Sequence, residues 1–166
     1  MPLSIACVYS VESYVSLEKP IRDGASVPFG IATIASVLKN AGHDVELLVF
    51  TPDTPVVATL RPFIERCRPQ LFCLTAVSTQ FPLISTVAEA IKQLDPGAYV
   101  VLGGAQASLM PDETIASPFI DAIGVGEGDS AIVELAAQET IGSGIALPCK
   151  SLLTFYLLHD SRSVKR

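Results

Sequence analysis

The sequence has little of the chemistry on which most metal centres depend. It contains no tryptophan, two histidines and four cysteines among 166 residues. The cysteines are Cys7, Cys67, Cys73 and Cys149, and no two of them have C-x-x-C or C-x-x-x-C spacing. Structural zinc sites and iron–sulfur clusters draw on closely spaced thiolates. We therefore expect neither zinc nor an iron–sulfur cluster in this chain.

Groups for acid–base catalysis are equally scarce. His43 precedes an expected strand, at the amino end of the sheet, and no nucleophile–base pair stands out. The acidic residues of the second half can be explained as helix caps and as carboxylates that complement helix dipoles. These residues are Asp112, Glu113, Glu127 and Asp129. We therefore expect no catalytic residue and no metal site.

Basic residues and long apolar runs are also lacking. Eleven lysines and arginines stand against 17 acidic residues, which gives a net charge of -6 and no basic patch for nucleic acid. No apolar run approaches the roughly 20 residues that cross a bilayer. The first residues lack the basic start and long apolar core of a signal peptide. We expect a cytoplasmic protein with neither nucleic acid nor membrane as a partner.

The chain does have a regular alternation of strand and helix patterns. The expected strands are 3–9, 44–50, 71–77, 99–102 and 122–125. The expected helices are 31–38, 55–67, 82–94, 111–116 and 129–139. Such alternation predicts an α/β protein with a doubly wound parallel sheet. We expect a flavodoxin-like or Rossmann-like fold with five strands in the order 2-1-3-4-5.

Two parts of the chain differ in composition. Residues 1–140 carry the alternating pattern and form the expected domain. Residues 141–166 begin with a linker-like Gly-Ser-Gly and end in a basic segment. The apolar run 152–158 within this tail fits either an extra strand or a helical turn.

Glycines cluster where two consecutive strands end. Gly103 and Gly104 follow strand 99–102, and Gly124, Gly126 and Gly128 lie at the exit of strand 122–125. Ligands of open parallel sheets bind outside the carboxyl ends of the strands. Because glycine lets a ligand approach the backbone closely, we interpret these two loops as the floor of a binding site.

Small neutral polar groups follow the same strand ends. They are Ser78, Thr79, Gln80, Gln106 and Ser108. A rim of this kind suits a large uncharged or amide-rich ligand better than a phosphate-rich one. The run from Gly124 to Asp129 does not match the dinucleotide motif, because Asp129 stands where glycine or alanine is required.

The sequence resembles the cobalamin-binding domain of cobalamin-dependent radical S-adenosylmethionine enzymes. The resemblance covers about residues 3–139. Three segments carry it: Pro28-Phe29-Gly30-Ile31 through Asp44-Val45; Ser78-Thr79-Gln80-Phe81-Pro82; and Gly103-Gly104-Ala105-Gln106-Ala107-Ser108 with Pro111, Glu113 and 121–129.

This resemblance implies that the corrin lies on the carboxyl ends of the strands and that the nucleotide tail inserts beside the double glycine. By matching position, Gly103, Gly104 and Ser108 would line the tail pocket. Gly126 and Glu127, with Gly128, would flank its mouth. Ser78 and Gln80 would border the corrin, and Gln106 stands where the family usually has histidine.

The radical domain of that family is not found in this sequence, since no C-x-x-x-C-x-x-C motif is present. The resemblance therefore implies a truncated or free-standing module without catalysis of its own. It would present cobalamin to a partner that performs radical or methyl-transfer chemistry. The Asp-x-His-x-x-Gly motif that supplies a cobalt ligand in mutases is also absent.

Two other interpretations remain open at this point. One is a flavodoxin-like interaction domain without a cofactor, and the other is a small nucleotide- or flavin-binding protein. The Gly104→Val substitution is expected to distinguish a cobalamin-binding module from a cofactor-free interaction domain. The substitution should block the tail and cost at most about 1–3 kcal/mol of stability.

Overall fold

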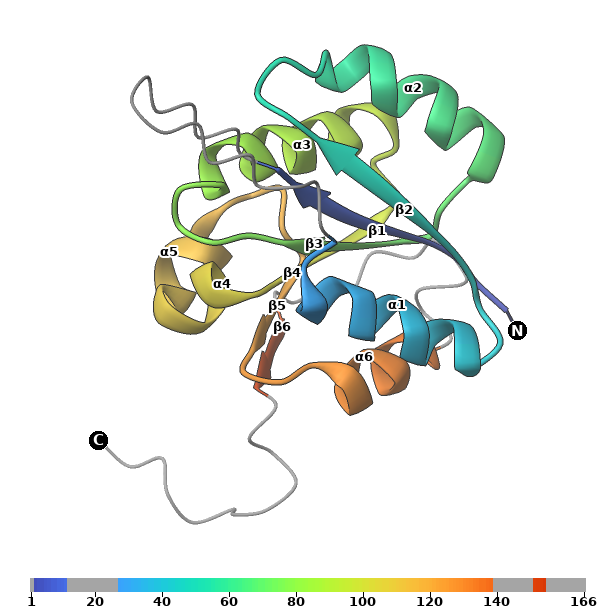
Figure 1. The fold of residues 1–166 in the computed structure, drawn as a ribbon, viewed down its shortest axis with the longest axis vertical. Coiled ribbons are helices and arrows are strands. Elements are labelled where there is room, and N and C mark those ends of the chain that lie inside the picture. Colours follow the sequence, from blue (N-terminus) through green and yellow to red (C-terminus); the bar gives the residue numbers. More distant parts are fainter. Residues whose placement is uncertain (1, 12–26, 139–150, 155–166) are drawn as a thin grey trace, which may run out of the picture.

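The computed structural model describes residues 2–11 and 27–138 and the backbone of 151–154. Its strands are β1 (Ser4–Ser10), β2 (Asp44–Phe50), β3 (Leu71–Thr75), β4 (Tyr99–Gly103), β5 (Ala122–Val125) and β6 (Ser151–Thr154). Its helices are α1 (Phe29–Asn40), α2 (Val56–Cys67), α3 (Phe81–Leu94), α4 (Ala105–Leu109), α5 (Pro111–Ala116) and α6 (Asp129–Ala136). Strands and helices alternate along the chain, as the sequence predicts (Figure 1).

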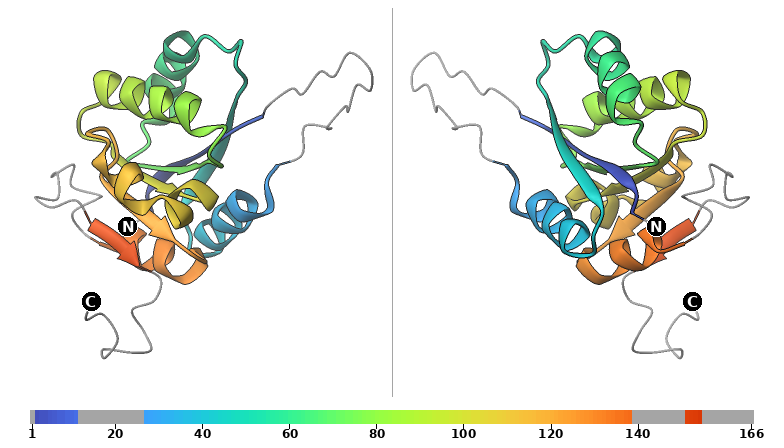
Figure 2. Two further views of the ribbon diagram at one scale, coloured as in Figure 1. Left: turned by 90° about the vertical axis from the view of Figure 1, so that its left-hand side faces the viewer. Right: turned by 90° about the vertical axis from the view of Figure 1, so that its right-hand side faces the viewer.

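The strands form one parallel sheet in the order β2-β1-β3-β4-β5-β6. Every pairing is parallel, including that of β1 with both β2 and β3. The predicted five-stranded order 2-1-3-4-5 is therefore confirmed. Residues 151–154 add β6 at the outer edge of β5, in register from Ala122 opposite Ser151 to Val125 opposite Thr154 (Figure 2).

Each face of the sheet is covered by a different set of helices. Helices α2 and α3 pack on one face, where Leu60, Phe72 and Ile84 are fully buried. Helices α1 and α6 pack on the other face, around Leu38 and Cys7 (Figure 1). This two-sided cover explains why the strands are near-continuous apolar runs rather than alternating ones.

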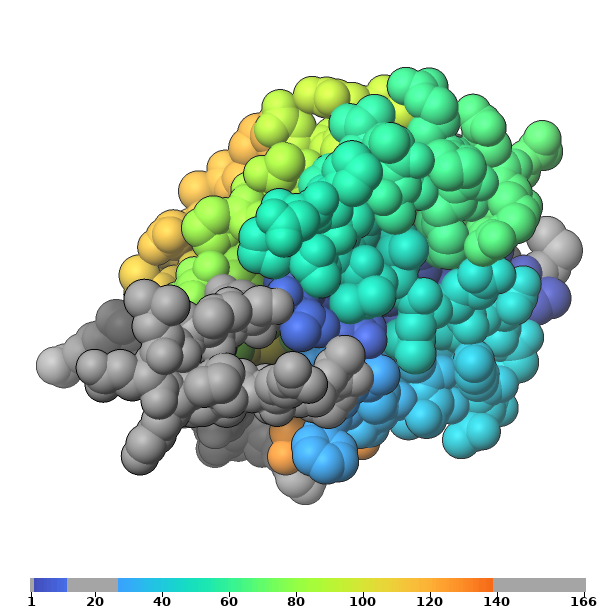
Figure 3. Space-filling model, turned by 45° about the horizontal axis from the view of Figure 1, so that its top comes forward, coloured from blue at the N-terminus to red at the C-terminus, as the bar shows by residue number. Residues whose placement is uncertain are grey.

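The edge of the sheet at β2 is partly open. Leu47 and Val49 on this strand are each more than two-fifths exposed. Figure 3 shows this side of the molecule, with α2 and α1 flanking β2. Among the described residues, no helix is long and apolar enough to cross a membrane.

One ion pair fastens the amino ends of β4 and β5. The Lys92 ammonium lies 2.6 Å from Asp121 Oδ2 and donates to the Ala98 carbonyl at 2.6 Å. The same Asp121 oxygen accepts the backbone N–H of Val100 at 2.7 Å. The two side chains are only 18% and 28% exposed, so the carboxylate is held by partners rather than by bulk water.

We expect Asp121→Ala to lower the free energy of unfolding by about 2–4 kcal/mol, because it removes the carboxylate that pairs with a partly buried ammonium and leaves the Val100 N–H without its acceptor. Urea denaturation measures this change. The matched control is Glu46→Ala, which breaks the exposed pair with Arg66 and should cost less than about 1 kcal/mol. Equal losses of unfolding free energy in the two variants would contradict the larger stabilising role of the partly buried pair.

Candidate functional site

The candidate site starts at Gly103, a residue without a side chain at the end of β4. Side chains alternate between the faces of a strand, so Gly103 belongs to the same face as Val101, under α1 and α6. An ideal Cβ built on Gly103 meets no atom within 4 Å. On β5, the same alternation puts Gly124 on the face to which Ala122 belongs. Glycine at the last inward-facing position of β4 therefore leaves open space above the sheet.

This space is a cavity of about 450 Å³ at the carboxyl ends of β3, β4 and β5. Cavities of this size are typical of small-molecule sites. The floor is formed by Cys73, Val101, Gly103 and Gly124, and Ile31 and Ile34 of α1 form one wall. Ile132 of α6 and the loop 126–129 close the opposite side.

Gly104 lines the cavity and is also required by the fold. Its φ of +89° belongs to the left-handed region, and an ideal Cβ there would lie 2.6 Å from Thr75 Oγ1 and 2.9 Å from the Ala76 carbonyl oxygen. Gly104 lines the pocket with its backbone, but its missing side chain faces the end of β3. The expected stability cost of at most about 1–3 kcal/mol for Gly104→Val is therefore too small, because the new side chain collides with the protein itself.

Ser108 connects the two glycine loops. Its hydroxyl oxygen accepts the backbone N–H of Gly126 at 3.0 Å. Gly126 itself has a φ of +85°, a conformation that glycine adopts without strain. Ser108 is not among the residues that line the cavity, so it holds the loop in place from outside.

Three other predicted site residues lie away from the cavity. Gln106 is only 2% exposed and belongs to α4, a helix that the sequence analysis did not foresee. The α4 backbone is tied to the residue after β3, because the Gln106 N–H donates to the Ala76 carbonyl at 3.0 Å. The prediction that Gln106 belongs to an exposed polar rim is therefore wrong.

Gln80 and Ser78 follow β3 on the outer surface. The Gln80 side chain accepts the N–H of Val77 at 3.2 Å and donates to the Ser10 carbonyl at 3.0 Å. It thereby joins the loop after β3 to the end of β1. Ser78 is exposed on the same turn and does not line the cavity.

The cavity also uses residues that were not predicted. These are mainly Ile31, Thr33 and Ile34 of α1 and Ile132 of α6. The three isoleucines look like ordinary core residues of amphipathic helices, and only the neighbouring glycines distinguish them from such residues. The useful signal was the strand alternation, which places Cys73, Val101 and Gly103 on one face beneath these helices.

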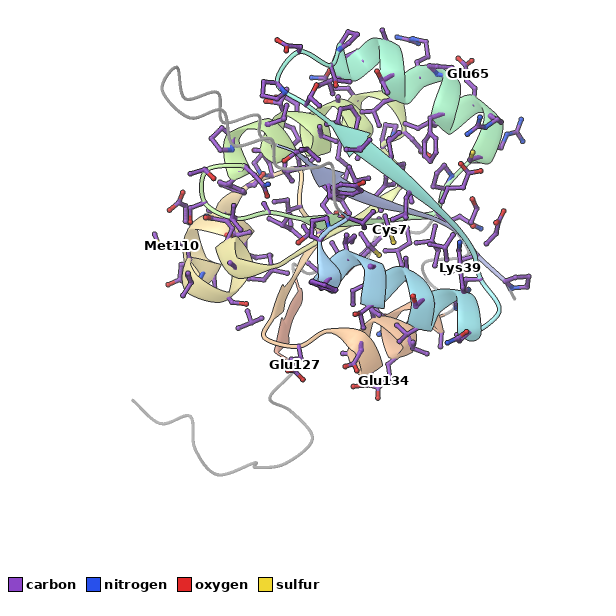
Figure 4. All side chains as sticks on the ribbon, in the orientation of Figure 1. Cys7, Lys39, Glu65, Met110, Glu127 and Glu134 are labelled. Atoms are coloured by element: carbon purple, nitrogen blue, oxygen red, sulfur yellow. The ribbon has the colours of Figure 1, made fainter. Side chains whose placement is uncertain are left out.

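Large apolar side chains surround the carboxyl edge of the sheet. Phe29 is 94% exposed, Leu109 is 73% exposed, and Val77 and Met110 are each more than two-fifths exposed. Figure 4 shows Met110 beside α4 and α5, and Glu127 on the loop from β5 to α6. None of these four side chains lines the cavity, and exposed apolar groups of this size are typical of an interaction surface.

Neither the buried thiol in the cavity floor nor His43 supplies an acid–base group to the cavity. A hydrogen bond to the Cys7 thiol and burial raise the pKa of Cys73 well above its usual value, so this thiol stays neutral. His43 lies at the opposite end of the sheet, where its Nδ1 accepts the Leu3 N–H at 3.1 Å. Burial and the nearby amino terminus lower the pKa of His43. No group of three or more metal-ligating side chains occurs within the described residues.

Together, the fold and the cavity define a doubly wound α/β domain with a small-molecule site at its carboxyl edge. The chain belongs to the B12 binding domain family, whose model matches residues 22–136. Cobalamin is thus the cofactor of the family. The open space at Gly103 and the apolar side chains of Ile31, Val101 and Ile132 beside it fit the insertion of a flat group.

The chain is also similar to individual proteins. It is 28% identical over 109 residues to the uncharacterized methyltransferase PH0819 of Pyrococcus horikoshii, and it spans 24% of that protein's length. Its fold is similar to the crystal structure of a novel cobalamin-binding protein from Desulfitobacterium hafniense. That match has a TM-score of 0.56 and 15% identity, and covers 81% of this chain and 58% of the other.

Proposed function

We propose that this chain is a cobalamin-binding module that holds the nucleotide tail of the cofactor in the 450 Å³ cavity. The observation that carries the proposal is the open space in front of Gly103, at the carboxyl end of β4. The family match assigns cobalamin, and this cavity supplies a place where a flat group can enter between the sheet and α1. Ile31, Ile34, Val101 and Ile132 are the side chains that would enclose it.

The corrin would then rest on the apolar edge outside the cavity. Phe29, Val77 and Leu109 are exposed there and lose contact with water when a large ring covers them. When bound, cobalamin would supply the organometallic chemistry of methyl or radical transfer. The chain's own residues would bind, orient and shield it.

The catalytic partner is part of the same proposal. The chain matches about a quarter of a protein that is named a methyltransferase. We infer that the module serves a methyl-transfer reaction, with a radical S-adenosylmethionine domain as the partner of first choice. Co-purification with such a domain in the presence of cobalamin, but not in its absence, would support this pairing.

Titration of the purified chain with hydroxocobalamin tests the binding function. Calorimetry and the visible corrin spectrum should report one saturable site. Flavin mononucleotide and adenosine monophosphate serve as competitors for the alternative of a flavin or nucleotide site. Binding of either competitor without binding of cobalamin would contradict the proposal, and no binding at all would favour a cofactor-free interaction domain.

Ser108→Ala should weaken hydroxocobalamin binding by about two- to tenfold, because the loop at Gly126 loses one hydrogen bond worth about 0.5–1.5 kcal/mol. Ser36→Ala is the matched control. Ser36 also lies on an exposed surface, and its hydroxyl donates to the Ala32 carbonyl at 2.8 Å. Equal affinity for both variants and the native chain would show that the loop does not need this bond.

A further inference from the structure

Two buried cysteines lie opposite each other on neighbouring strands. Cys7 on β1 and Cys73 on β3 are direct partners in the parallel register. Both belong to the apolar cluster under α1 and α6, so their side chains share one face of the sheet. Cys7 is 0% exposed and Cys73 is 3% exposed. The strand pairing therefore places two thiols next to each other inside the core.

The two thiols are reduced and in contact. Both cysteines are free in the structure. They share a hydrogen bond, and this bond together with burial raises the pKa of Cys73 well above its usual value. Because the thiolate is the reactive form of cysteine, the raised pKa makes Cys73 a slow nucleophile. The pair is thus held as a neutral dithiol until an oxidant reaches it.

The spacing of the two strands suits a disulfide bond. Neighbouring strands of a sheet lie about 4.7–4.9 Å apart. Disulfides join residues whose Cα atoms are about 4.4–6.8 Å apart, so directly opposed positions fall at the short end of this range. A bond at that end is strained, and strained disulfides are readily reduced again. The geometry therefore allows a reversible bond between Cys7 and Cys73.

The cavity gives a small oxidant access to one of the two thiols. Cys73 lines the cavity together with Val101 and Gly103, whereas Cys7 is not among the lining residues. Because both side chains are almost completely buried, a molecule from solvent meets the pair through this cavity and at Cys73 first. Cys7 then lies next to Cys73 as the second thiol that a disulfide needs.

We propose that Cys7 and Cys73 form a disulfide when a peroxide enters the cavity. The Cys73 sulfur attacks one oxygen of hydrogen peroxide, the O–O bond breaks, and the thiol proton leaves with the other oxygen as water. The Cys7 sulfur then attacks the resulting sulfenic acid, the S–O bond breaks, and a second water leaves as the S–S bond forms. Two thiols are thereby oxidised, and one peroxide is reduced to two waters.

The reaction depends on whether the cavity is filled. A ligand inside the cavity separates Cys73 from the oxidant, whatever the chemistry of that ligand. The disulfide therefore forms faster in the empty module than in the loaded one. This modification site goes beyond the proposed function, and it does not depend on cobalamin being the ligand.

Peptide mass mapping after treatment with hydrogen peroxide tests the bond itself. The protein is the full chain with Cys67→Ser and Cys149→Ser, which keeps Cys7 and Cys73 as its only cysteines. We expect a monomer that has lost two hydrogen atoms, a linked pair of peptides that contain these two cysteines, and recovery of both thiols with dithiothreitol. Disulfide-linked dimers, oxygen addition without a linked pair, or two unmodified thiols would each overturn the inference.

Gly103→Leu in the same background tests the route through the cavity. The new side chain enters open space, because an ideal Cβ at Gly103 has no neighbour within 4 Å, and it obstructs the way to Cys73. We expect disulfide formation to slow at least about fivefold, since oxidation of a thiol follows its accessibility. Ser36→Leu is the control, since Ser36 is exposed on α1 and does not line the cavity. Equal rates in the two folded variants would overturn the cavity route.

Discussion

Gly103→Leu should abolish most cobalamin binding while the protein stays folded. The new side chain enters open space, because an ideal Cβ at Gly103 has no neighbour within 4 Å. It therefore fills the cavity rather than strains the sheet. We expect affinity to fall at least about a hundredfold, which equals about 2.8 kcal/mol. The free energy of unfolding should change by less than about 1 kcal/mol.

Hydroxocobalamin titration and urea denaturation of the same sample measure the two quantities. Ser36→Leu is the matched control, because it adds the same side chain on the exposed side of α1. It should bind as the native chain does. A Gly103→Leu protein that is folded and binds normally would show that the cofactor does not use this cavity.

Gly104→Ala should be strongly destabilising, although it lies one residue further along the chain. The backbone at Gly104 has φ +89° and ψ -170°, a region that is almost confined to glycine. The added methyl group would also lie 2.6 Å from Thr75 Oγ1 and 2.9 Å from the Ala76 carbonyl oxygen. Strain and overlap together should cost about 3–5 kcal/mol, a large part of a typical domain's stability.

Gly103→Ala is the control for this prediction, since its Cβ has room and its backbone is an ordinary strand. Urea denaturation should show a shift of less than about 1 kcal/mol for Gly103→Ala and a large loss for Gly104→Ala. Similar stability of the two proteins would contradict the assigned geometry. The pair separates a glycine that makes room for a ligand from a glycine that the fold itself requires.

The sequence predicted the sheet well because each strand is a short apolar run. The runs 44–50 and 122–125 match β2 and β5 residue for residue, and the order of the five strands is as expected. The central strands β1, β3 and β4 are recognisable locally, since a strand buried on both faces must be apolar throughout. The same reasoning left the run 152–158 open, and the structure places β6 at 151–154.

The short helix α4 was missed because its existence depends on contacts rather than on local pattern. Its five residues include no apolar stripe of helical length, and its first turn is fixed by a bond from the Gln106 N–H to the Ala76 carbonyl. Ala76 is 30 residues earlier in the chain. A pairing over this distance cannot be derived from the sequence around Gln106.

The site was predicted in part for a similar reason. Five of the nine predicted site residues line the cavity: Gly103, Gly104, Gly126, Glu127 and Gly128. These glycines are visible in the sequence as turn signals. The cavity walls from α1 and α6 could not be predicted from the sequence. Ile31 and Ile132 look like core residues until the positions of the glycines that line the same cavity are known.

Hydrogen exchange of the amide groups with and without hydroxocobalamin tests the central claim most directly. We predict that bound cofactor slows exchange in three segments, namely 30–34, 101–108 and 124–132, and leaves the β2 edge at 46–49 unchanged. These are the segments that enclose the cavity or hold its loops. Protection that avoids all three segments, or that concentrates at the β2 edge, would contradict a cobalamin tail held between α1 and the carboxyl ends of β3, β4 and β5.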